Sequence, residues 1–223
     1  MFLGHYAVAM GAKKAAPRGS LGTLVLAAQF ADLLWPVLLL AGVEHVRITP
    51  GITAVTPLEF VDYPISHSLA TLIGWALVIG GLYWLLRRDS RGAWIVGGVV
   101  VSHWIIDLIV HRPDLPLFPG GSARFGFGLW NSIPGTWLVE LGLFVLGIVV
   151  YVRATAARDA VGRYAFWIFV ASLVVIYVAS SFGPPPPNVT TLAASALAGW
   201  LFVLWGYWID RHREPAGSMR GPR

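Results

Sequence analysis

The sequence contains no cysteine and few charged residues, and both absences restrict what the protein can be. Without cysteine there are no disulfide bonds, no thiolate metal sites and no cysteine nucleophile. Charged residues make up 12% of the 223 residues, against about 25% in an average soluble domain, while hydrophobic residues make up 57%. This balance predicts a membrane protein with several spans.

Six apolar runs approach the roughly 20 residues that a membrane-spanning helix needs. They cover residues 21–43, 65–86, 93–110, 134–152, 161–182 and 189–209. A shorter apolar segment, residues 2–16, precedes them and is expected to form a half-helix. The predicted fold class is therefore all-α: a polytopic membrane helix bundle of six transmembrane helices plus a short N-terminal half-helix, in one domain over residues 1–210. Pro36 is expected to kink the first span.

Lysine and arginine positions predict the orientation of this bundle. The net charge of +5 does not indicate a nucleic-acid partner, because the basic residues cluster between the apolar runs. When six spans alternate across the bilayer, all of the 16 lysines and arginines except Arg47, Arg112 and Arg124 fall on one side. The positive-inside rule makes that side cytoplasmic, together with the basic tail 211–223. The tail is expected to lie near anionic headgroups without fixed structure.

Polar residues interrupt the apolar runs at similar depths. In "SHWIIDLIVH", residues 102–111, the side chains of His103, Asp107 and His111 recur every four residues and share one face of a helix. Given a rise of ~1.5 Å per residue, four further groups fall near the same level: His5, Asp32, His67 and Glu140. A charge at the bilayer centre costs ~3 kcal/mol or more on insertion scales, so such groups are rare and usually functional.

Histidine and carboxylate side chains in this pattern favour a metal site. Imidazole and carboxylate suit Zn²⁺, Mn²⁺ and Fe²⁺, and mixed sets often hold two ions that activate water. A dication would also explain how carboxylates stay ionised in the membrane. Structural alternatives remain open: a hydrogen-bonded His103–Asp107 pair in the core, an interfacial histidine at His67, and an Asp32 that serves backbone groups near Pro36.

Four sequence blocks together resemble the YdjM-like family of inner-membrane, metal-dependent hydrolases. They are Gly4-His5, "AAQFADLLW" around Asp32, "DYPISHSL" around His67 and "VSHWIIDLIVHRPDLPLFP" from Val101, and they cover residues 1–119. The family is similar in turn to zinc-dependent phospholipase C and P1-type nucleases. The resemblance implies a bacterial-type inner membrane, one or two divalent ions such as zinc, and five metal ligands: His5, Asp32, His67, His103 and Asp107. Asp62 stands where the family has a histidine and is a further candidate ligand.

Other polar residues are candidates for catalysis and substrate binding. Glu140 has three open roles: a further metal ligand, a general base, or a hydrogen-bond partner between helices. Asp62 is the second candidate for handling the proton. Three residues of the predicted outer loops are candidates for countering substrate charge: His111, Arg112 and Arg124. In "GFGLWNS", Trp130 and Asn131 are candidates for a lid over the pocket, with a plain re-entrant connection as the alternative.

These expectations combine into a membrane-embedded, metal-dependent hydrolase that opens to the extracytoplasmic half of the bilayer. A site at this depth meets membrane lipid more readily than soluble molecules. We therefore expect a phosphoester of a lipid or lipid-linked substrate, while other small molecules stay open. Two other classes also stay open: a transporter coupled to protons or a divalent metal, and a structural membrane protein without catalysis.

Overall fold

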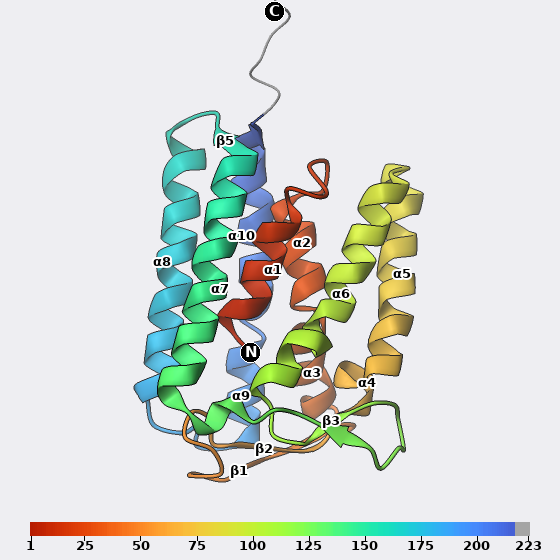
Figure 1. Cartoon of the computed structure of the whole chain (residues 1–223), viewed down its shortest axis with the longest axis vertical. Helices are drawn as coiled ribbons and strands as arrows, with labels where there is room; N and C mark the ends of the chain where they lie inside the picture. Colours follow the sequence, from red (N-terminus) through yellow and green to blue (C-terminus); the bar gives the residue numbers. More distant parts are fainter. Residues whose placement is uncertain (217–223) are drawn as a thin grey trace, which may run out of the picture.

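Long apolar helices run side by side along the molecule in the computed structural model, which describes residues 1–216 (Figure 1). The α-helices are α1 (Leu3–Ala12), α2 (Leu21–Ala28), α3 (Phe30–Leu40), α4 (Pro64–His67), α5 (Leu69–Arg87), α6 (Ser90–Val110), α7 (Ile133–Ala154), α8 (Ala160–Phe182), α9 (Val189–Ala196) and α10 (Gly199–Arg211). A short 3-10 helix, η1 (Leu129–Asn131), precedes α7. The predicted all-α fold class is confirmed.

The helices have the length and composition of a multi-pass membrane protein. Within residues 1–216, five segments are long and apolar enough to cross a bilayer: α5, α6, α7, α8 and the segment Val189–Arg211, which contains α9 and α10. The pair α2 and α3 adds a sixth if it is counted as one bent span. Large apolar side chains also face outwards, among them Leu77, Trp94 and Leu138, which are 66%, 78% and 77% exposed. Such a surface is suited to lipid.

Capping residues in the sequence set where most of these helices begin. A Ser, Asp or Asn side chain accepts a hydrogen bond from the backbone N–H three residues later at the start of six helices, the usual N-cap arrangement. The capping residues are Ser20, Ser68, Asp89, Ser132, Asp159 and Asn188. The loops between apolar runs therefore encode helix starts as well as charge.

The first span bends at Gln29, not at Pro36 as predicted. The axes of α2 and α3 differ by 55°, and Gln29 between them has φ −97° and ψ 4°. Pro36 lies inside α3, which continues through it. Neighbouring helices in a membrane bundle can satisfy the backbone group that a proline frees, so proline does not have to break the helix.

Helix α1 is the predicted half-helix, and its N-terminus lies at mid-height within the bundle (Figure 1). It packs between α2, α6 and α7. The approach to α7 is close because Gly147 has no side chain: a Cβ there would lie 2.6 Å from the backbone oxygen of Ala7. This contact holds the start of the chain in the interior.

Short two-stranded sheets, which the sequence analysis did not predict, order the connecting loops. Strand β1 (His45–Ile48) pairs with β2 (Leu58–Asp62), and β3 (Leu115–Pro116) pairs with β4 (Arg124–Phe125), both antiparallel. Together they cover the end of the bundle that lies nearer α4 (Figure 1).

The start of the C-terminal tail is structured, so the prediction that it has no fixed structure from Arg211 is wrong there. Strand β6 (Arg213–Pro215) pairs with β5 (Thr155–Ala157) at the end of the bundle opposite β1. Buried Arg213 donates to the hydroxyl of Thr155 and to the carbonyl of Gly162. These bonds explain the order, because they give a basic residue partners inside the protein. Residues 217–223 lie outside the described chain.

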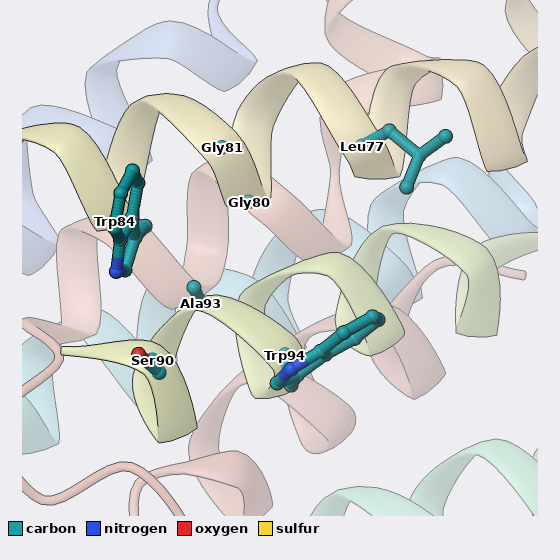
Figure 2. A pocket seen from close by; sticks show the side chains of 7 residues that line it. All are labelled: Leu77, Gly80, Gly81, Trp84, Ser90, Ala93 and Trp94. Atoms are coloured by element: carbon teal, nitrogen blue, oxygen red, sulfur yellow. The ribbon is translucent and has the colours of Figure 1, made fainter.

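A cavity of about 310 Å³ lies between α5 and α6, and Figure 2 shows the residues that line it. Seven residues line it: Leu77, Gly80, Gly81, Trp84, Ser90, Ala93 and Trp94. None of the predicted site residues is among them, and the lining carries no charged group. This cavity therefore belongs to the apolar surface and not to the polar cluster described next.

Candidate metal centre

Five predicted ligands from four helices meet inside the bundle. His5 comes from α1, Asp32 from α3, His67 from α4, and both His103 and Asp107 from α6. Their ligand atoms form two groups of three, each with all atoms within 4.8 Å of one another. One group is His5, His103 and Asp107, and the other is Asp32, His67 and His103. His103 is thus common to both groups.

The Nε2 atoms of the histidines face carboxylate oxygens. His103 Nε2 lies 3.2 Å from Asp107 Oδ2 and 3.8 Å from Asp32 Oδ1. His5 Nε2 lies 3.1 Å from Asp107 Oδ1, and His67 Nε2 lies 3.4 Å from Asp32 Oδ1. Two carboxylates therefore lie among three imidazoles at distances that a small cation between them can bridge.

Only one member of this cluster is accessible. The side chains of His5, His67, His103 and Asp107 are at most 3% exposed, whereas that of Asp32 is 42% exposed. A ligand reaching the cluster from outside would meet Asp32 first. The burial of the other four groups makes the cluster costly unless its polar atoms are satisfied.

The partner of His103 fixes which of its nitrogens carries hydrogen. His103 Nδ1 lies 2.8 Å from the backbone oxygen of Ala28, next to the bend at Gln29. A carbonyl oxygen only accepts, so Nδ1 must donate, and in a neutral ring the lone pair is then on Nε2. That lone pair faces the oxygens of Asp107 and Asp32, which are also acceptors.

Acceptors that face each other in a buried site can be satisfied together by a cation. Among the described residues, His103 Nε2 and both ring nitrogens of His5 are buried without a hydrogen-bond partner. The terminal amino group of Met1 contacts Asp107 and supplies one positive charge at that carboxylate. It does not touch the lone pairs at His67 or His103. The donor set therefore fits a divalent metal ion such as Zn²⁺, bound through imidazole and carboxylate.

His111, predicted to bind substrate, lies at the edge of the cluster. Its Nε2 is 3.7 Å from Asp107 Oδ2, and its Nδ1 is 2.9 Å from Asp114 Oδ1. Burial lowers the pKa of the His111 imidazole below its ordinary value, so a neutral ring donates to Asp114 and turns a lone pair toward Asp107. The four-residue spacing on α6 thus places His103, Asp107 and His111 together. His111 belongs to neither group of three, and its Nε2 lies beside Asp107 at the edge of the cluster.

Glu140 holds the start of α1. Its Oε2 accepts hydrogen bonds from the backbone N–H groups of Phe2 and Leu3, at 2.9 and 2.6 Å. These are two of the N–H groups that have no partner within the helix itself. Of its three predicted roles, the contacts correspond to the hydrogen-bond partner between helices. Through α1, Glu140 also sets the position of His5.

The remaining predicted residues lie outside the cluster. Asp62 is exposed on β2, where it pairs with His45. Arg112 lies 3.7 Å from Asp114, and exposed Arg124 donates to the backbone of Gly121. No contact with the five ligands is found for any of these three in the described chain.

The two residues predicted to form a lid are on η1. Trp130 packs on His111, with ring centroids 4.3 Å apart, and on Phe60, with centroids 6.0 Å apart. Asn131 is exposed at the end of η1. Trp130 therefore packs against His111, while Asn131 is exposed.

The sequence analysis missed Glu44. This residue is 1% exposed and lies next to Ser66, the neighbour of His67. Ser66 could have been singled out from its place beside a candidate ligand. Glu44 gave no such signal, because it lies in a loop far from His67 in the chain and only the fold brings the two segments together.

No family model matches the chain, and neither the curated proteins nor the solved structures include a significant match to it.

Proposed function

We propose that the protein is a membrane-embedded, metal-dependent hydrolase. The observation that carries this proposal is the orientation of His67 and His103. Their Nδ1 atoms are engaged by neighbouring oxygens, and their Nε2 lone pairs face the carboxylates of Asp32 and Asp107. A buried structural cluster would gain nothing from acceptors that face each other, whereas a cation site requires them.

The proposed ligands are the five residues of the cluster. A divalent ion held there supplies a Lewis acid and lowers the pKa of water. Asp107 and Asp32 balance its charge, and His67, His103 and His111 keep their orientation through their Nδ1 partners. Asp32, the accessible member, marks the side from which a substrate reaches the site.

The proposed substrate is a phosphoester of a lipid or lipid-linked molecule. The bundle presents apolar side chains outwards, and α4, which carries His67, lies near the end covered by β1, β2 and β3 (Figure 1). Arg112 and Arg124 supply positive charge at that end. By the distribution of basic residues we assign this end to the extracytoplasmic side and the C-terminus to the cytoplasm. The resemblance to the YdjM-like family supports a bacterial-type inner membrane.

A network of hydrogen bonds across one end of the bundle favours an enzyme over a transporter. At the far end of α1, Lys13 is 5% exposed and donates to Asp210 Oδ2 and to the carbonyl of Gly19, both at 2.8 Å. Asp210 also accepts from Leu21 N and from the hydroxyl of Tyr151. These bonds join α1, α2, α7 and α10 at the end of the bundle where α1 ends. A transporter would need a second opening at this end, and the bonds oppose one.

Metal analysis of the purified protein tests the proposal. We expect at least one equivalent of zinc, manganese or iron in the wild type, and its loss in the double variant His103→Ala, Asp107→Asn. Wild-type protein should then hydrolyse a phospholipid or lipid-diphosphate in a panel of such substrates, and the variant should not. Equal metal content in the two proteins would overturn the proposed function.

A further inference from the structure

We propose that Glu44 and Ser66 are positioning residues, which fix the tautomer of His67 so that its Nε2 can bind a metal ion. This inference rests on the proposed function, because it assigns a role relative to the metal centre. Ser66 contacts Nδ1 of the His67 ring, whereas Asp32 faces Nε2. Neither residue touches the metal ligands other than His67.

Glu44 is a buried carboxylate whose oxygens are both used. It lies between α3 and β1 and is 1% exposed. Its Oε1 accepts from the backbone N–H of Ile65 and of Ser66, at 2.7 and 2.9 Å. Its Oε2 accepts from the hydroxyl of Ser66 at 2.5 Å. Oε1 thus binds the backbone of α4, and Oε2 binds the side chain of Ser66.

Hydrogen-bond polarity passes from Glu44 to His67. An ionised carboxylate only accepts, so the Ser66 hydroxyl gives its one hydrogen to Glu44. The Ser66 oxygen, 2.7 Å from His67 Nδ1, can then only accept from that nitrogen. In a neutral ring, His67 is therefore the Nδ1–H tautomer, and its Nε2 lone pair points to Asp32 Oδ1, 3.4 Å away. Metal-binding histidines are commonly oriented by such a partner on the second nitrogen.

The chain contains a second Ser-His pair that is built differently. Ser102 precedes His103, but its hydroxyl donates to the carbonyl of Val99 in its own helix, at 2.6 Å. His103 takes its Nδ1 partner from Ala28 instead. The same dipeptide therefore has a serine that orients its histidine in one case and a serine that does not in the other. Ser102 is a matched control for Ser66.

Two variants separate the hydrogen-bond chain Glu44–Ser66–His67 from the backbone contacts of Glu44. Ser66→Ala removes the hydroxyl but leaves both backbone N–H groups bonded to Glu44. Glu44→Gln keeps an oxygen for the backbone and presents an N–H₂ donor to Ser66, which reverses the polarity and favours hydrogen on His67 Nε2.

Zinc affinity of the full-length protein in detergent is measured by competition with a chromophoric chelator. Nitrogen-15 NMR of the histidines in the metal-free protein reports the tautomer.

We expect zinc affinity to fall about 10- to 100-fold in Ser66→Ala and Glu44→Gln, the range for loss of an outer partner of a ligating histidine, and to be unchanged in Ser102→Ala. The wild-type His67 should be the Nδ1–H tautomer, and that signal should change in Glu44→Gln. Wild-type affinity in Ser66→Ala, or an Nε2–H tautomer of His67 in the wild type, would overturn the positioning role of Glu44 and Ser66 while the proposed function stands. Wild-type protein that binds no metal would overturn both.

Discussion

His5 and His103 stack face to face in the centre of the bundle, with ring centroids 3.7 Å apart and planes 2° from parallel. One ring comes from the half-helix at the start of the chain and the other from α6. Both rings turn Nε2 toward Asp107. Two protonated imidazoles would repel each other at this distance, so the stack disfavours charge on both rings at once.

His103 should be the most sensitive ligand, because it belongs to both groups of three. We expect His103→Ala to lose all bound metal, whereas His5→Ala and His67→Ala each disturb one group and retain part of it. Elemental analysis of the purified variants measures this difference. His45→Ala, which removes an exposed histidine on β1, should keep the wild-type content. Full retention by His103→Ala would contradict the shared position.

Glu140 should act through its acceptor oxygen rather than its charge. Glu140→Gln keeps an oxygen for the N–H groups of Phe2 and Leu3, so we expect it to retain bound metal and hydrolysis of the lipid substrate. Glu140→Ala removes the acceptor from both donors, and the buried N–H of Leu3, left unpaired, costs about 1–3 kcal/mol. Thermal unfolding and metal content compare the variants. A Gln variant with full metal but no activity would instead identify Glu140 as the general base.

Gly147 should be intolerant of a side chain. In Gly147→Ala the new Cβ would meet backbone atoms of Ala7 at 2.6–3.0 Å, and backbone cannot move aside as a side chain can. We expect a loss of stability of about 1–3 kcal/mol, the usual effect of overpacking, and weaker metal binding because α1 carries His5. Gly142→Ala on the same helix is the control, since its Cβ would have no neighbour within 4 Å. Equal unfolding temperatures for the two variants would show that α1 and α7 are not in close contact.

The buried pair of Lys13 and Asp210 should be needed for stability. Lys13→Met leaves a carboxylate that is 13% exposed without its ammonium partner, and breaking a buried pair from one side costs about 3–5 kcal/mol. Lys14→Met is the control, because Lys14 is exposed. Unfolding of both variants in detergent is measured with increasing denaturant. A shift no larger than that of the Lys14 variant would mean that the pair is solvated.

Asp159 should stabilise the protein only while it is ionised. A hydrogen bond from Gly162 N, with the contact to His212, lowers the pKa of Asp159 below its ordinary value. A carboxyl group whose pKa is lower in the folded state adds stability above its unfolded pKa and loses it as the pH falls through the folded value. We expect Asp159→Asn to be less stable than wild type at pH 7, with the difference disappearing on acidification below about pH 4. Asp89→Asn, which caps α6 without an ion pair within residues 1–216, controls for cap geometry.

The sequence by itself determined the membrane-type helices and the level at which polar groups occur. Apolar length specifies a span because lipid offers no partner to backbone groups, and capping residues such as Ser68 and Asp159 specify where helices start. The four-residue spacing of His103, Asp107 and His111 specifies one helix face in any context. These are local properties, so they can be read along the chain.

Only the tertiary structure decided which of these groups meet and how each is oriented. The bend at Gln29 places the carbonyl of Ala28 beside His103, and the loop after α3 brings Glu44 to Ser66. The tertiary structure also places Glu140 at the start of α1 and leaves Asp62 on the surface. Such contacts join segments that are distant in the chain, and a carboxylate or a carbonyl acquires a role only from the donor that packing puts opposite it.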